Sequence, residues 1–145
     1  MIGMAGKDER GFVLQVEFLI TIFIFIAVLF GAQDYWLVQV QMQQAEHVKN
    51  EYLNRVRVSG CLTATDYDAM AESLKEAGFN LVSCNAPTTP VTRDVSDPES
   101  SEVWLSFTVS FKQKPFLLSS LLGMDNANSF TPTFAGRELS EYVGS

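Results

Sequence analysis

The sequence predicts an α+β protein, in which a long N-terminal transmembrane-plus-amphipathic helix carries a small antiparallel β-sheet head that contains a short helix. Three observations lead to this class. The first third of the 145-residue chain holds an uninterrupted apolar run. The stretch that follows repeats apolar residues every three or four positions, which is typical of an amphipathic helix. Further along, a segment in which apolar and polar residues alternate indicates a half-buried strand.

The apolar run covers residues 18–32 and contains no charged residue. Extended back to Val13, it reaches about twenty residues, enough for a helix to cross about 30 Å of hydrocarbon. Tyr35 and Trp36 follow the run directly. Aromatic residues at this position anchor a helix at the membrane interface. We therefore expect a single membrane-spanning helix.

The flanking charges predict the orientation of this helix. Lys7 and Arg10 precede the run, and the next cation is Lys49, which favours a cytoplasmic N-terminus and a head outside the cytoplasm. A cleavable secretory signal is the alternative, but signal peptidase requires small residues one and three positions before the cut. A cut after Ala32 would put Phe30 in the second of these positions. We therefore expect the segment to be retained.

The helix is predicted to continue well beyond the membrane. Residues 33–58 contain neither Gly nor Pro, and their apolar residues fall on one helical face. These residues are Tyr35, Val38, Met42, Ala45, Val48, Tyr52 and Val56. We expect one helix from Phe12 to Val58, about 70 Å long at about 1.5 Å per residue, ending at Gly60. A single-pass protein with a juxtamembrane coiled coil would show the same features.

The head begins with a predicted short helix at residues 65–77. Thr65 is the expected N-cap, with Asp68 three residues later, and Gly78 is expected directly after the helix. Its buried stripe is predicted to hold Tyr67, Met70, Leu74 and Ala77. Residues 79–84 are predicted to form the first strand, and residues 85–101 a loop rich in Pro, Thr, Ser and Asp.

Residues 102–112 form the clearest predicted strand, because apolar and polar residues alternate throughout. Its apolar face is Val103, Leu105, Phe107, Val109 and Phe111. Residues 130–134 predict a weaker strand, which Pro132 assigns to the edge of the sheet. Residues 115–124 are apolar but too short to span a membrane. They either cover the core of the head or form a contact surface for the membrane or for neighbouring subunits.

Composition excludes several classes of function. The formal net charge is −7, from ten Lys and Arg against seventeen Asp and Glu, so a nucleic-acid partner is not expected. Two cysteines and the single histidine, His47, are too few for a zinc site, which needs about four ligands. The sequence holds no phosphate-binding loop and no nucleophile–base pair that we can defend. We expect no enzymatic activity, no metal and no cofactor.

Cys61 and Cys84 both lie on the predicted exported side, where a disulfide is the natural state of such a pair. The bond would tie the first strand of the head to the end of the long helix. Closing a loop of about 24 residues would stabilise the fold by about 3 kcal/mol. The alternative is two free buried thiols in a cytosolic domain.

Glu17 is the residue that demands an explanation, because it lies inside the apolar N-terminal segment. A carboxylate costs about 3 kcal/mol at the centre of a bilayer, and less near its edge. Such a residue usually has a charged partner. The alternative is that Glu17 lies close enough to the cytoplasmic face to be solvated.

Residues 7–18, KDERGFVLQVEF, resemble the class III leader of type IV pilins and of the TadE-like pseudopilins. In this family a short charged leader ends in Gly, and a prepilin-type peptidase cuts after it. The resemblance implies cleavage after Gly11, with Phe12 as the new N-terminus. It also implies that Glu17 is an assembly carboxylate, paired with the N-terminal amine of a neighbouring subunit. Glu17 would be the sixth mature residue, whereas the family usually has this Glu at the fifth.

The resemblance implies a leader at 1–11, a transmembrane helix at 12–32, its amphipathic continuation at 33–60 and an extracytoplasmic head at 61–145. The implied function is that of a structural or assembly subunit of a type IV pilus-like or tight-adherence filament. Its partners would be the membrane, the prepilin-type peptidase and other pilin-like subunits, bound through the N-terminal helix. The alternative is a non-polymerising, membrane-tethered accessory protein of a secretion or conjugation apparatus.

Overall fold

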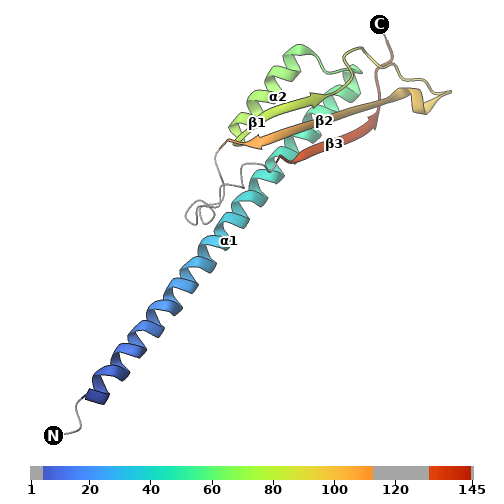
Figure 1. Cartoon of the computed structure of the whole chain (residues 1–145). Coiled ribbons are helices and arrows are strands. Elements are labelled where there is room, and N and C mark those ends of the chain that lie inside the picture. The colour runs from blue at the N-terminus through green and yellow to red at the C-terminus, as the bar shows by residue number, and fades with distance from the viewer. Residues whose placement is uncertain (1–4, 113–130, 145) are drawn as a thin grey trace.

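A computed structural model of the chain describes residues 5–112 and 131–144. It confirms the predicted α+β class, since a long helix carries a head built from a short helix and an antiparallel sheet (Figure 1). The elements in chain order are α1 (Ala5–Ser59), α2 (Ala64–Glu76), β1 (Phe79–Asn85), the 3₁₀ helix η1 (Pro98–Ser101), β2 (Glu102–Phe111) and β3 (Thr133–Leu139).

The long helix α1 is continuous over 55 residues and begins earlier than predicted, at Ala5. Gly11 does not interrupt it, because one glycine weakens a helix by only about 1 kcal/mol. The predicted end at Gly60 is confirmed. This residue has φ +77°, and its N–H donates to the Val56 carbonyl at 2.7 Å. A Cβ at Gly60 would lie 2.9 Å from the backbone N and O of Val91, so the position excludes a side chain.

The N-cap of the short helix α2 lies two residues before the predicted one. Thr63 is the N-cap, and its Oγ1 accepts a hydrogen bond from the Asp66 N–H at 3.1 Å. Thr65, the predicted cap, lies inside the helix. Thr65 and Asp68 have the same spacing as the pair that caps the helix, so spacing alone could not separate them. Gly78 follows the helix with φ +91°, as predicted.

The three described strands form an antiparallel sheet in the order β1-β2-β3. Strand β1 covers the predicted residues and Asn85. Its register with β2 shifts between Leu81 and Ser83, which is the pattern of a β-bulge. Strand β2 agrees with the prediction to within one residue and is the central strand.

Strand β3 corrects the prediction for the last strand. It runs from Thr133 to Leu139, so residues 130–134 were the wrong range, although the edge position is confirmed. Pro132 lies just before the strand, and its carbonyl accepts from the Val109 N–H at 3.1 Å. Only Phe134 within β3 is fully buried. The strand therefore depends on backbone pairing with β2. Its own sequence has little apolar periodicity from which its bounds could be predicted. Residues 115–124 lie outside the described residues.

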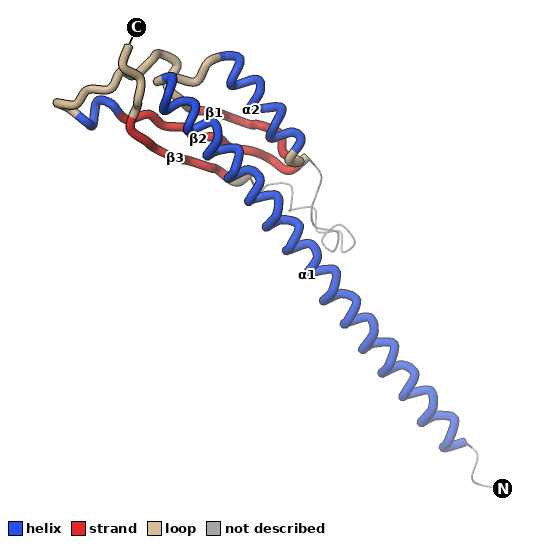
Figure 2. Tube along the Cα trace, turned by 180° about the vertical axis from the view of Figure 1, so that it is seen from behind, coloured by secondary structure: helices blue, strands red, loops and turns tan. Residues whose placement is uncertain are grey.

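Both helices pack on one face of the sheet (Figure 2). The core between these two layers contains Ala45, Val48, Tyr52, Leu53, Met70, Leu74, Phe79, Leu105, Phe107, Val109 and Phe134. Two tilted ring pairs strengthen it, with centroid distances of 5.0 Å for Phe79 and Phe111 and 5.5 Å for Phe107 and Phe134.

The predicted buried faces of α1 and α2 are each confirmed only in part. Tyr35 is 67% exposed, because this part of α1 lies outside the head, whereas the unpredicted Leu53 is buried. A Cβ at Gly136 of β3 would lie 2.6 Å from the Leu53 side chain, so a glycine lets α1 approach the sheet. On α2 the predicted Met70 is buried, but Tyr67 is 42% exposed.

Candidate functional site

The N-terminal half of α1 extends away from the head as an exposed apolar rod (Figure 1). Its phenylalanines are largely exposed, as in Phe12 at 68% and Phe23 at 70%. Within the described residues, α1 is the one helix long and apolar enough to cross a membrane. An 18-residue window reaches a mean hydropathy of 2.6, and none of it is buried inside the protein. This surface is the main candidate for a functional contact.

Gly11 and Glu17 both lie on this rod and are exposed. A Cβ at Gly11 would meet no atom within 4 Å, so neither packing nor backbone conformation requires glycine there. Gly31, near the other end of the apolar run, is equally open. The Thr21 hydroxyl donates to the Glu17 backbone carbonyl at 2.8 Å, which satisfies the one hydroxyl of the run within the helix.

Asp34 is a charged residue whose position the sequence analysis missed. It follows the apolar run directly and is only 5% exposed. Its neighbours Tyr35 and Trp36 are 67% and 66% exposed, as expected for interfacial aromatic residues. The sequence shows this charge but does not show that it is buried.

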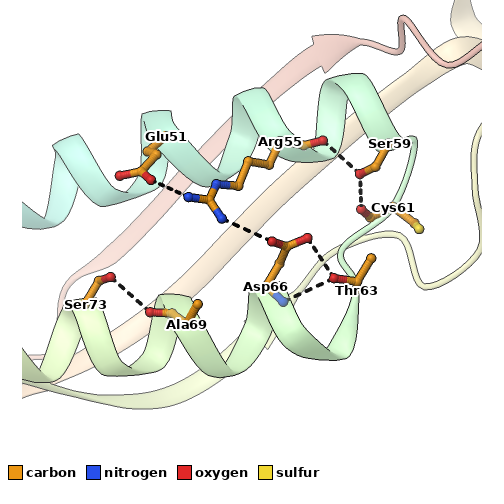
Figure 3. A network of polar contacts seen from close by, with 8 residues as sticks. All are labelled: Glu51, Arg55, Ser59, Cys61, Thr63, Asp66, Ala69 and Ser73. Atoms are coloured by element: carbon orange, nitrogen blue, oxygen red, sulfur yellow. Dashed lines mark hydrogen bonds and ion pairs between the residues drawn. The ribbon is translucent and has the colours of Figure 1, made fainter.

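A polar network joins the end of α1 to the start of α2 (Figure 3). The Arg55 guanidinium donates to Glu51 at 2.8 Å and to Asp66 at 3.3 Å. It also lies 4.7 Å from the centre of the Tyr52 ring. Exposed ion pairs stabilise a fold by less than about 1 kcal/mol each. The network therefore orients α2 against α1, while the apolar core supplies most of the attraction.

The predicted disulfide is absent, since Cys61 and Cys84 are both free thiols. Cys84 lies opposite Phe107 in the sheet and packs against the hydrophobic core. Cys61 follows the end of α1, where its carbonyl accepts from the Ser59 hydroxyl at 2.7 Å. The prediction relied on compartment and chain order, which do not determine where a strand directs a side chain.

The structure predicts unequal reactivity for the two thiols. Partial burial raises the pKa of the Cys84 thiol, because apolar surroundings disfavour a thiolate. In a Cys61→Ser variant, Cys84 should therefore alkylate more slowly in the folded protein than in denaturant near pH 8.5, about the ordinary pKa of a thiol. Because the folded state holds this proton longer, the contribution of Cys84 to stability is lost as pH rises above that value.

Iodoacetamide labelling followed by mass spectrometry measures these rates, and Cys84→Ser is the matched variant that reports on Cys61. Equal rates for folded and denatured Cys84 would contradict the predicted protection. Non-reducing peptide mapping of wild-type protein gives a second test. A linked Cys61–Cys84 peptide would show that the free thiols are not the native state.

Two further titratable residues lie on the helices, His47 on α1 and Asp66 on α2. His47 is exposed on α1. Asp66 accepts a hydrogen bond from the Thr63 hydroxyl at 2.7 Å and belongs to the cap of α2. Among the described residues, no group of three or more His, Cys, Asp or Glu side chains could hold a metal ion.

Comparison of the chain with protein-family models, with curated proteins and with solved structures finds no match. The geometry of α1 and the chemistry of Gly11 and Glu17 are the basis for a functional assignment.

Proposed function

We propose that this chain is a membrane-anchored, pilin-like or pseudopilin-like subunit that contacts its neighbours through the N-terminal half of α1. The observation that carries this proposal is the division of one continuous helix into an exposed apolar half and a half packed in the head. The exposed half suits a bilayer before assembly. The same apolar surface suits packing against equivalent helices in a filament.

Rigid attachment of the head favours a polymerising subunit over a simple tether. Ala45 and Val56 of α1 are completely buried, and α1 contacts both β2 and β3. The head therefore keeps a constant orientation relative to the helix axis. Repeated head-to-tail contacts build a helical filament only when every subunit presents the same geometry. A tether needs no such constraint, and a flexible linker would serve it equally well.

Glu17 fits a contact between subunits better than one within its own helix. Cleavage after Gly11 would create an amine at Phe12, five residues before the carboxylate. Five residues correspond to a rise of about 7.5 Å and a rotation of about 140° beyond one full turn, so the two groups face different directions. The amine of a neighbouring subunit can approach Glu17 without this restriction. Adjacent opposite charges then offset the cost of placing each in an apolar filament.

The proposal places the N-terminus in the cytoplasm and the head outside it. It also assigns a recognition role to Gly11, since the structure gives no packing reason for a glycine there. A prepilin-type peptidase must unwind the helix around the bond that it cuts. Glycine adopts extended conformations readily, so Gly11 would make this unwinding easier.

Processing is the direct test. Intact-mass spectrometry of protein from its native host should show loss of residues 1–11 and a chain that begins at Phe12. Gly11→Val should abolish this loss, because a β-branched side chain replaces the residue at the cut. Gly31→Val is the matched control, since Gly31 is an equally open glycine of the same helix. Full-length protein as the only native species would favour the non-polymerising accessory protein.

A further inference from the structure

The face of the sheet that the helices leave open contains a hollow of about 750 Å³. Figure 1 views this face, with α1 and α2 behind the sheet. All three strands contribute to its lining, through Asn85 of β1, Trp104 of β2 and Arg137 of β3. Ligand sites in proteins typically enclose about 300–1,000 Å³. The hollow is therefore large enough for a small ligand.

Strand register brings the lining side chains together. Trp104 and Arg137 are direct cross-strand partners, so their side chains lie on the same face. The Trp104 indole N–H donates to the Asn85 side-chain carbonyl at 3.4 Å, which orients the ring. Glu102, two residues earlier on β2, forms an ion pair with Arg137 at 3.8 Å. These contacts group one aromatic ring with a carboxylate, an amide and a guanidinium.

Trp104 is not required by the hydrophobic core. Its neighbours Val103 and Leu105 are completely buried against the helices, whereas Trp104 is 38% exposed on the opposite face. The residues that follow it on this face, Ser106, Thr108 and Ser110, are polar. A large aromatic ring on a polar face offers a flat apolar surface with hydrogen-bonding groups beside it.

We propose that this hollow binds a saccharide, with one sugar ring stacked on the Trp104 indole and its hydroxyls bonded to Asn85, Glu102 and Arg137. A sugar ring has an apolar C–H face and a rim of hydroxyls. Each hydroxyl both donates and accepts hydrogen bonds. The hollow offers the matching set, since Arg137 donates, Glu102 accepts and the Asn85 amide does both.

Other ligand classes fit this chemistry less well. Arg137 is the one cation among the described residues that line the hollow, and carboxylates of Glu99 and Glu102 accompany it. Phosphate groups need a cluster of cations instead. An extended peptide would add to the edge of β1 or β3, the outer strands among the described residues, rather than lie across the face of the sheet.

The hollow lies on the head, and none of its lining residues belongs to α1. The Arg57 carbonyl in the last turn of α1 accepts from the Glu141 N–H at 2.8 Å. The carbonyl of Ser101, the last residue of η1, accepts from the Ser140 N–H at 2.8 Å. A filament subunit and a membrane-tethered protein could both present such a site to their surroundings. The saccharide proposal therefore does not rest on the proposed assembly function.

Full-length protein in a detergent without a sugar head group provides the test, because glycoside detergents would compete for the site. A Trp36→Phe background leaves Trp104 as the single indole. Cellotetraose, maltotetraose and chitotetraose are each titrated to about 10 mM while indole emission is recorded. At least one should shift the emission and saturate, with a Kd of about 1 mM or lower. No change with any of the three would overturn the proposal.

Calorimetry with the sugar that binds then identifies the residues responsible. Trp104→Ala should weaken binding by at least about tenfold, through loss of the stacking surface. Ser110→Ala, on the same face of β2 but outside the hollow, should bind as wild type does. If circular dichroism shows that Trp104→Ala is unfolded, the 79%-exposed Arg137 is replaced by Ala instead, with a loss of at least about threefold expected. Undiminished binding by the folded variant would overturn the proposal.

Discussion

Glu17→Gln should leave the protein in the membrane with its leader removed, yet reduce its assembly with other subunits by about 100-fold or more. The substitution keeps the shape of the side chain and removes its charge, which lowers the cost of insertion. In the proposed filament, however, it leaves the neighbouring Phe12 amine without its anion. An unpaired charge in an apolar environment costs about 3–5 kcal/mol, and each 1.4 kcal/mol or so is tenfold in an equilibrium.

Cross-linking between subunits measures this loss. Single cysteines at positions within residues 18–30 are introduced after Cys61 and Cys84 are replaced by Ser, so that only the helix can form cross-links. The matched control combines Glu17→Gln with Gln15→Glu. It restores a carboxylate that is rotated by about 200° around the helix. This control should not recover assembly. Undiminished cross-linking in Glu17→Gln would contradict the assembly role. It would indicate instead that Glu17 is solvated at the membrane interface.

Phe107→Ala should cause the largest loss of stability in the head, about 3–5 kcal/mol. The side chain is 1% exposed, lies on the central strand and contacts the Phe134 ring at a centroid distance of 5.5 Å. Its removal leaves a cavity between the sheet and the helices. Since a small domain has a total stability of about 5–15 kcal/mol, the loss should shift the unfolding midpoint strongly.

Denaturant titration followed by near-UV circular dichroism provides the measurement. Thr108→Ala is the matched control, because Thr108 is the next residue of β2 and points to the open face. It loses only a hydroxyl contact with Thr133 at 2.9 Å, so its effect should stay below about 1.5 kcal/mol. Equal effects for the two variants would mean that the packing of the helices against β2 contributes little to stability.

Local sequence patterns determined much of this fold. The apolar run and the three-to-four-residue spacing after it predicted α1, because a helix repeats its side-chain directions within a few residues. Gly60 and Gly78 predicted the helix ends, since both adopt a positive φ that other residues avoid. The alternation of apolar and polar residues predicted β2, because side-chain directions repeat every two residues along a strand. The exposed rod that carries Gly11 and Glu17 was therefore visible in the sequence.

Other features depended on contacts between residues far apart in the chain. Strand β3 forms because β2 supplies its hydrogen-bond partners, although its own sequence shows no regular alternation of apolar and polar residues. The choice between Leu53 and Tyr35 follows from where the sheet covers α1. The packing of Cys84 against the core follows from the pairing of β1 with β2.

The sequence by itself thus determined the long apolar helix, the central strand and the residues on which the proposed leader processing rests, because each depends on neighbours within a few positions. Only the tertiary structure determined the burial of Asp34 and the hollow around Trp104. That hollow joins Asn85 to Arg137 through the shared strand β2, across about fifty residues of chain. Such proximity is set by register and layer packing, which no short stretch of sequence contains.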